Sequence, residues 1–148
     1  SDICFELTES ALAPDKRNNE VLFNQLKNAG CKIALDDFGT GYSSLSYLRR
    51  IPVDYIKIDK SFITDICTNN EDNILVSTII AMSKSLGKEV VAEGVETKEQ
   101  LQLLIELGCD YIQGYYFSKP LPAEKLASYL TDFSYSCLPS SELVIDFT

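Results

Sequence analysis

Three segments of the chain repeat one order of features, and this repeat limits the folds that the sequence can adopt. Each has the end of an apolar helix, a glycine, a short apolar strand and then a polar residue: NAGCKIALD, SLGKEVVAE and ELGCDYIQG. The polar residues are Asp36, Glu93 and Gln113. Alternation of helix and strand predicts parallel strands with right-handed crossovers, so these side chains should gather at the carboxyl ends of the strands.

The pattern predicts five strands, at Ile3–Leu7, Cys31–Asp36, Tyr55–Asp59, Glu89–Ala92 and Asp110–Gln113. A closed barrel of eight strands needs about 250 residues, whereas this chain has 148. We therefore predict an α/β fold that is part of a (β/α) TIM-type barrel, about its last five strands. The first and last of these strands would have open edges, which invite pairing with another chain.

Helices are predicted between the strands from apolar residues at helical spacing. The pattern Thr97 to Gln100 is a capping box that opens one of them. Residues 69–72 are expected to form a polar loop, and residues 133–148 a Ser-rich tail whose end is either a strand or disordered. The predicted helices are Glu20–Ala29, a short one closing at Tyr47–Arg50, Asn73–Leu86, Thr97–Leu107 and one after Pro122 to about Leu130.

Composition excludes several classes of chemistry. The chain has no histidine, which excludes Ser-His or Cys-His nucleophiles and His-based zinc sites. A metal would need oxygen ligands, which favours Mg²⁺ or Mn²⁺. The formal charge of −9 argues against binding of DNA or RNA through a basic face. Five scattered cysteines without CxxC spacing indicate reduced thiols in a cytosolic protein, and no apolar run is long enough to span a bilayer.

One stretch combines features of a metal site. Asp36 and Asp37 follow an apolar strand and precede the glycine-rich loop Gly39, Thr40 and Gly41. Adjacent carboxylates repel each other, and a shared cation keeps both ionised. The same stretch is also compatible with an ordinary strand-to-turn junction, because Asp and Gly are common turn residues.

The polar residues at the predicted strand ends allow two kinds of chemistry. Paired metals with Lys57 beside them suit in-line displacement at phosphorus, and Glu93 could bind metal or accept a proton. Carboxylates with a lysine also suit enolase-type proton abstraction. A capping or indirect role is expected for Asp59 and Glu96. The full set is Glu6, Asp36, Asp37, Lys57, Asp59, Glu93 and Gln113.

Five segments, in order, closely resemble the EAL-domain cyclic-di-GMP phosphodiesterases of bacterial signalling. They are FELTES (5–10), LDDFGTGYSSL (35–45), DYIKIDKSFI (54–63), VVAEGVET (90–97) and DYIQGYYFSKPLP (110–122). The resemblance implies hydrolysis of cyclic di-GMP to linear pGpG with Mg²⁺ or Mn²⁺ in a two-metal site, inhibited by Ca²⁺. It removes the enolase-type alternative.

The resemblance also implies roles for particular residues. Glu6 and Asp36 would bind one metal ion and Asp36 and Asp37 the other, with Glu93 as metal ligand or general base. Lys57 would contact the attacking water or the phosphate, and Gln113 would complete the metal shell through a water. The remaining implied residues are Asp37, Lys57, Gln113 and Pro120 for substrate binding, and Glu9, Gly39, Thr40, Gly41, Asp59 and Glu96 for the flap and indirect support.

Residues 1–132 would then be the carboxyl-terminal part of an EAL domain, with residues 133–148 as the tail. The family's Glu-Ala-Leu segment and its metal-binding asparagine precede the matching segments, so we expect the chain to be inactive alone. The main alternative is a non-catalytic cyclic-di-GMP receptor or interaction module. The resemblance further implies a homodimer through the Asp37–Ser44 flap and the following helix, in a cytoplasmic protein whose other domains could anchor it to a membrane.

Overall fold

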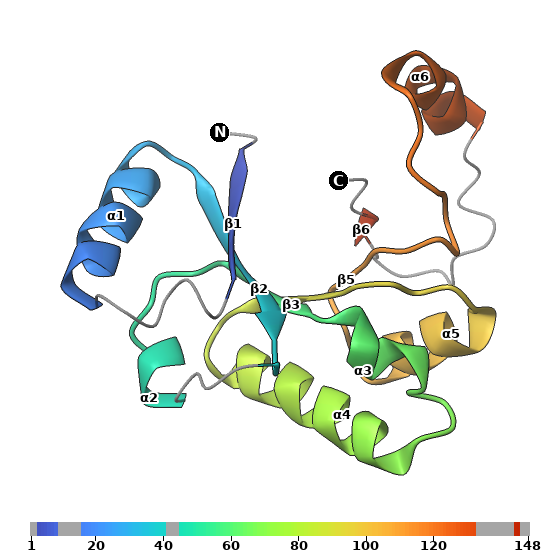
Figure 1. The fold of residues 1–148 in the computed structure, drawn as a ribbon, viewed down its shortest axis with the longest axis horizontal. Helices are drawn as coiled ribbons and strands as arrows, with labels where there is room; N and C mark the ends of the chain where they lie inside the picture. Colours follow the sequence, from blue (N-terminus) through green and yellow to red (C-terminus); the bar gives the residue numbers. More distant parts are fainter. Residues whose placement is uncertain (1–2, 9–15, 41–44, 133–143, 146–148) are drawn as a thin grey trace.

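The computed structural model describes residues 3–8, 16–40, 45–132 and 144–145 (Figure 1). Its strands form one parallel sheet in the order β1 to β6, with sequential strands always neighbours. This arrangement confirms the predicted parallel α/β architecture. The strands are β1 (Cys4–Thr8), β2 (Lys32–Phe38), β3 (Tyr55–Ile58), β4 (Glu89–Ala92), β5 (Tyr111–Ile112) and β6 (Val144–Ile145).

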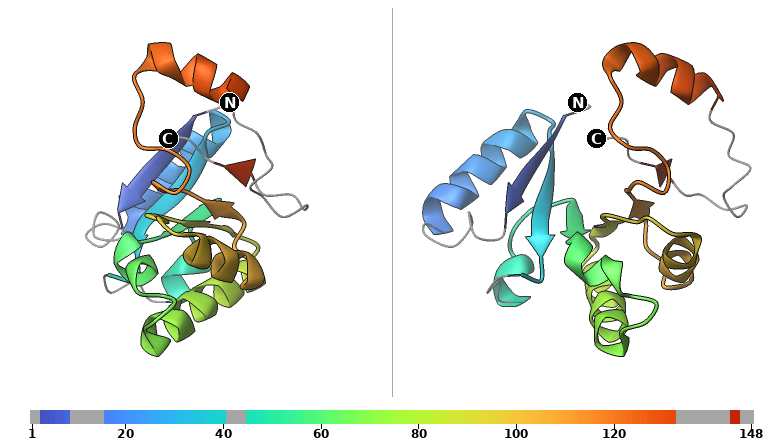
Figure 2. Two further views of the ribbon diagram at one scale, coloured as in Figure 1. Left: turned by 90° about the vertical axis from the view of Figure 1, so that its right-hand side faces the viewer. Right: turned by 45° about the vertical axis from the view of Figure 1, so that its right-hand side comes forward.

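Helices connect the strands and pack on the sheet, with α4 contacting β3 and β4 and α1 contacting β2. The last helix, α6, stands apart from the others in the views of Figures 1 and 2. No helix in the described ranges has the length and hydropathy that crossing a membrane requires. The helices are α1 (Lys16–Asn28), α2 (Leu45–Leu48), α3 (Lys60–Thr64), α4 (Asn70–Ser85), α5 (Lys98–Glu106) and α6 (Ala123–Asp132).

One helix boundary and one strand boundary differ from the prediction because of side-chain caps. Residues 69–72 do not form a loop: the Asn69 side chain accepts a hydrogen bond from Glu71 N at 2.9 Å, so α4 begins at Asn70. The strand β3 ends at Ile58, one residue earlier than expected, because the Asp59 side chain caps α3. Helix α3 itself was not predicted, since five residues are too few for a visible apolar period.

The core lies between the sheet and the helices. Alternate residues of β2 and β3 point into it, and Phe23, Val76, Ile80 and Leu104 of the helices pack in the same cluster. Burial of each such side chain contributes about 1.5–3 kcal/mol to folding. The core therefore fixes the register of the strands that carry the polar residues at their ends.

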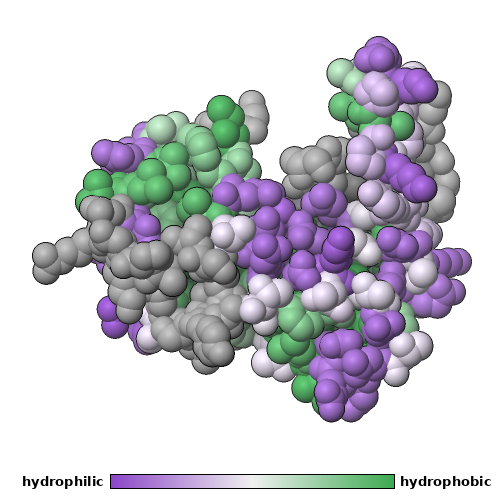
Figure 3. All heavy atoms as spheres, in the orientation of Figure 1, coloured by the Kyte–Doolittle hydropathy of each residue, from purple (hydrophilic) through white to green (hydrophobic). Residues whose placement is uncertain are grey.

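The two outer strands have different edges. The prediction of an open edge on β5 is wrong, because β6 pairs with it in parallel, with Tyr111 opposite Val144. At the other side, β1 has no second neighbour among the described strands. Apolar side chains lie exposed there, and Figure 3 shows apolar surface gathered over β1 and α1, where Ile3, Phe5, Val21 and Leu22 are exposed.

Opposite the carboxyl ends of the strands, carboxylates hold the strand starts together. Asp54, just before β3, accepts from Ile33 N of β2 at 2.8 Å and pairs with Lys27 Nζ at 2.6 Å. Asp110, just before β5, accepts in the same way from Val90 N of β4 at 2.9 Å. The repeated Asp-Tyr-Ile sequences at 54–56 and 110–112 therefore serve the same structural role twice.

Candidate functional site

The ammonium of Lys57 lies at the centre of the polar cluster at the carboxyl end of the sheet. Its Nζ is 2.6 Å from Glu6 Oε1, 2.7 Å from Glu93 Oε1 and 3.2 Å from Asp36 Oδ1. These partners come from β1, from the residue after β4 and from β2. Because the strands are parallel, residues up to 87 positions apart in sequence (Glu93 and Glu6) meet at one edge.

A bulge in β2 brings both adjacent aspartates to the same site. Between Leu35 and Phe38, β2 has one residue more than the paired stretch of β3, where Ile56 and Ile58 are the partners. Asp37 has a positive φ of 54°, which is uncommon for a residue other than glycine. In a regular strand, neighbouring side chains point to opposite faces, so the bulge is what allows Asp36 and Asp37 to converge.

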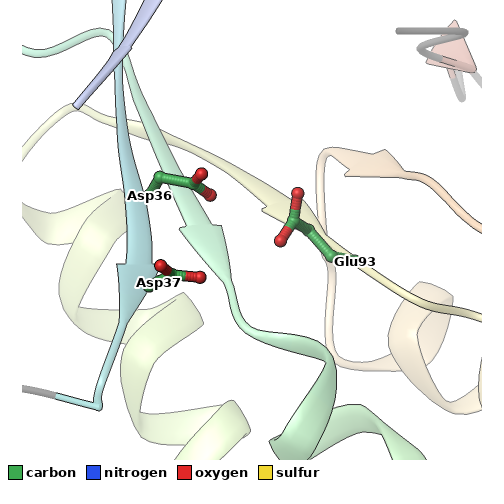
Figure 4. A group of neighbouring side chains, drawn as sticks. All are labelled: Asp36, Asp37 and Glu93. Carbon is green, nitrogen blue, oxygen red and sulfur yellow. The ribbon is translucent and has the colours of Figure 1, made fainter. Parts of the chain in front are cut away.

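Asp36, Asp37 and Glu93 form a compact group of oxygen donors. One carboxylate oxygen of each lies within 4.8 Å of the other two. Figure 4 shows the three side chains turned toward a common space between β2 and the end of β4. All three donors are carboxylate oxygens, which suit Mg²⁺, Mn²⁺ or Ca²⁺ and do not suit a thiolate-seeking metal. The donor set therefore fits the divalent ion that the sequence predicts.

The surroundings shift the protonation of two residues in opposite ways. Burial alone would lower the pKa of Lys57, but hydrogen bonds to Glu6 and Glu93 and the charges of Glu93 and Asp36 raise this pKa above its ordinary value. Burial raises the pKa of Glu93, against the lowering effect of Lys57. Lys57 is thus held as a cation, while Glu93 is easier to protonate than an exposed glutamate.

Asp37 shares its environment with other acids. Burial, the charge of Asp36 and the charge of Asp59 raise the pKa of the Asp37 carboxyl group. Asp59 accepts a hydrogen bond from Ser61 N at 2.9 Å as the cap of α3. Repulsion among neighbouring carboxylates is relieved when a cation binds between them.

The loop after β2 begins close to the acidic pair. Thr40 Oγ1 donates to Asp37 O at 2.8 Å, and Gly39 has a φ of 101° with the Phe62 ring beside it. Gly41 and Glu9, which were predicted to belong to the flap and its anchor, lie outside the described residues. Glu96 is exposed, and its backbone N–H donates to Gln100.

Gln113 follows β5 and borders a cavity of about 300 Å³. Its backbone N–H donates to Ala92 O at 2.9 Å, and its carbonyl accepts from Val95 N at 3.1 Å. The exposed Pro120 lines the same cavity, together with Tyr115, Phe117, Leu121, Leu126 and Tyr129. Of the candidate site residues, Gln113 and Pro120 therefore border this cavity, together with the aromatic side chains of Tyr115 and Phe117.

Sequence reasoning missed two residues that hold this edge together. Gln100 was read only as a capping residue, yet its side chain also reaches α3. Gly114 follows the predicted strand Asp110–Gln113 and has no predicted role, yet a Cβ there would overlap the backbone of Val95. The capping-box pattern marks Gln100 in the sequence. No local pattern indicates that the backbone at Gly114 lies against that of Val95.

The EAL domain family model matches residues 1–120 of the chain. The cyclic di-GMP phosphodiesterase NbdA of Pseudomonas aeruginosa is 45% identical over 139 residues, which are 92% of this chain and 18% of NbdA. A solved structure of the PaMucR phosphodiesterase with c-di-GMP matches at a TM-score of 0.79 and 44% identity, over 83% of this chain and 50% of that one. Another solved structure, the Klebsiella pneumoniae BlrP1 manganese and cy-diGMP complex, matches at a TM-score of 0.74 and 38% identity. This match covers 79% of this chain and 30% of that one.

The chain thus spans less than a fifth of NbdA and half of the solved PaMucR chain. The two solved structures match 83% and 79% of this chain, at 44% and 38% identity. With a family model that matches most of its length, this chain belongs to the EAL domain family.

Proposed function

We propose that the chain supplies one side of the catalytic site of a cyclic-di-GMP phosphodiesterase that uses Mg²⁺ or Mn²⁺. The observation that carries this proposal is the group of Asp36, Asp37 and Glu93 oxygens within 4.8 Å of one another, beside the Lys57 ammonium. Relatives named for this activity and a relative solved with manganese and cy-diGMP support it. The reaction would add water to one phosphodiester bond and give linear pGpG.

Each polar residue then has a distinct task. Glu6, Asp36, Asp37 and Glu93 would hold the divalent ions, with Gln113 in the surrounding shell. Bound Mg²⁺ or Mn²⁺ would polarise the phosphoryl oxygens and make bound water a better nucleophile. Lys57, kept charged by its carboxylate partners, would stabilise negative charge that develops at the phosphate. The alternative task for Glu93 is to accept a proton as general base, for which its pKa, raised by burial, is suited.

The substrate would extend from this edge toward the cavity beside β5. Asp37 and Lys57 would contact the polar part of the substrate, and Gln113 and Pro120 line the cavity together with aromatic and apolar residues. A guanine base can stack on such apolar walls while its phosphate faces the cations. Glu9 and the loop of Gly39, Thr40 and Gly41 would cover the bound dinucleotide, and Asp59 and Glu96 would support them indirectly.

The activity is proposed for a protein with a complete EAL domain. Residues 1–132 would be the domain portion and residues 133–148 the tail, and we expect the chain to be inactive alone. A homodimer through residues 37–44 and α2, in a cytoplasmic protein, also stays a prediction. Cross-linking and mass measurement in solution would test the dimer, and a monomer at all concentrations would contradict it.

The test compares the chain alone with a protein that contains it in a complete EAL domain. Hydrolysis of cyclic di-GMP is followed by separation of linear pGpG, with Mg²⁺, Mn²⁺ or chelator present. We expect turnover only in the complete domain and its loss in Asp36→Asn, which keeps the side-chain volume but removes a ligand charge. The exposed Asp65→Asn is the matched control. Binding without turnover would make the protein a receptor and overturn the proposal.

A further inference from the structure

The side-chain amide of Gln100 uses its whole hydrogen-bonding capacity between helix α3 and the segment that precedes α5. Its Oε1 accepts from Glu96 N at 2.8 Å and from Thr97 N at 3.0 Å. Its Nε2 donates to Ile63 O at 3.1 Å and to Thr64 O at 3.0 Å. The residue is only 6% exposed. An amide offers two N–H donors and an oxygen with two lone pairs, so every available bond is made.

Those partners lie in the two segments that follow Lys57 and Glu93 in the sequence. Ile63 and Thr64 end α3, which begins immediately after Lys57, Ile58 and Asp59. Glu96 lies three residues after Glu93, in the segment that leads from β4 into α5. The amide oxygen is thus bonded to the segment after Glu93. The amide nitrogen is bonded to the end of α3, the helix that follows Lys57.

Two further contacts hold the same two segments, residues 58–64 and residues 93–97, together. Glu93 N donates to Ile58 O at 3.2 Å. Gly94 has a φ of 71°, and a Cβ there would overlap the side chain of Lys60. Because this packing leaves no space for a methyl group, the two segments have little freedom to move relative to each other. Gln100 closes this contact at its far end, away from the carboxylates.

We propose that Gln100 is a positioning residue that sets the distance between the Lys57 ammonium and the Glu93 carboxylate. It touches neither group and acts through α3 and through the backbone of residues 94–97. Its kinetic consequence rests on the proposed phosphodiesterase function, whereas its effect on the geometry does not. The competing interpretation is that Gln100 only caps α5, for which its oxygen alone suffices.

Two substitutions separate these interpretations. Gln100→Glu keeps the oxygen that accepts from Glu96 and Thr97 but replaces the donor to α3 by a second acceptor. Gln100→Met removes all four hydrogen bonds but keeps a side chain of similar length. The controls are Gln102→Glu and Gln102→Met, on the same helix but exposed. A pure cap predicts that Gln100→Glu behaves like its control, and the positioning role predicts that it behaves like Gln100→Met.

In a complete EAL domain, we expect both Gln100 variants to lower kcat for cyclic di-GMP by about 10- to 100-fold, because small misplacements of reacting groups are costly. The KM should change by less than about threefold, since the substrate-binding surface is intact. Both Gln102 variants should match the wild type. A Gln100→Glu variant with wild-type kcat would overturn the proposal, and a wild type without turnover would instead overturn the proposed function.

Two readouts remain valid without turnover. The first is Mn²⁺ affinity by calorimetry, which should fall by about tenfold in both Gln100 variants, as for losses of supporting groups around metal ligands. The second is the carboxyl ¹³C resonance of Glu93 without metal, which should move in Gln100→Glu and not in Gln102→Glu. An unmoved resonance with unchanged Mn²⁺ affinity would refute the positioning role. If Gln100→Met does not fold, Gln100→Asn, which keeps the amide but shortens its reach, replaces it.

Discussion

Lys57 Nζ and Glu93 Oε1 lie 2.7 Å apart, although 36 positions separate the two residues in the sequence. The parallel pairing of β3 with β4 creates this contact, with Lys57 opposite Val91, two residues before Glu93. The lysine side chain is only 7% exposed, and that of Glu93 19%. A pair this sheltered is screened less by solvent than a surface ion pair, so a change in either partner should have large effects.

Replacement of the Lys57 cation should separate metal binding from catalysis. In Lys57→Met, three carboxylates lose their shared partner, so we expect Mn²⁺ affinity to rise by about threefold or more. The kcat should fall by about 100-fold, because no ammonium then stabilises charge at the phosphate. Calorimetry and pGpG formation measure the two effects. The exposed Lys125→Met is the control for charge, and a parallel loss of metal affinity in Lys57→Met would contradict the assignment.

The positive φ of Asp37 should limit which residues fit there. Asp37→Asn and Asp37→Val both remove the charge, but asparagine tolerates the left-handed region and a β-branched residue does not. We expect the valine variant to be less stable than the asparagine variant by about 1–2 kcal/mol. Urea unfolding measures the difference. Equal stabilities would show that the bulge relaxes when the residue changes.

The ion pairs of Asp54 should make stability depend on pH. Burial alone would raise the pKa of Asp54, but hydrogen bonds from Lys27 and Ile33 N, with the charges of Lys27 and Lys32, lower it below 3.8. The folded state therefore binds this proton less tightly than the unfolded chain. The resulting stability is present above pH 3.8 and is lost as the pH falls through the folded-state pKa.

We expect Asp54→Asn to be less stable than the wild type by about 1–2 kcal/mol near neutral pH. The difference should shrink toward zero as the pH falls below 3.8. Urea unfolding across this range, with the exposed Asp65→Asn as control, measures it. A difference that stays constant down to the acid limit would mean that the side chain contributes by packing and not by charge.

Two glycines should respond differently to a methyl group. Gly87→Ala places the new Cβ in open space, so its cost is the strain of φ at 68°, about 1–2 kcal/mol. Gly114→Ala places it on the backbone of Val95, which donates to Gln113 O and accepts from Tyr116 N. We expect a larger loss of stability in Gly114→Ala, with weaker Mn²⁺ binding in the complete domain. Similar losses in both variants would show that the β5 loop moves aside freely.

Local sequence patterns determined most of the framework. Glycines at 30, 87 and 108 end helical patterns and precede apolar strands, and the structure has strands at each place. The parallel architecture follows because strands joined by helical crossovers can pair in only a few ways. The position of polar residues at the ends of those strands then predicts that Glu6, Asp36, Lys57 and Glu93 approach one another, and their distances in the structure agree.

Other features depend on contacts between distant segments, which local patterns do not encode. The period-two rule puts Asp36 and Asp37 on opposite faces, and only the bulge against β3 brings both into one group. The pairing of β6 with β5 and the reach of Gln100 to α3 likewise join residues 33 and 37 positions apart. The sequence by itself determined which residue types stand at the strand ends. The tertiary structure decided which of them meet, because side-chain direction depends on strand register and on packing that the whole core sets.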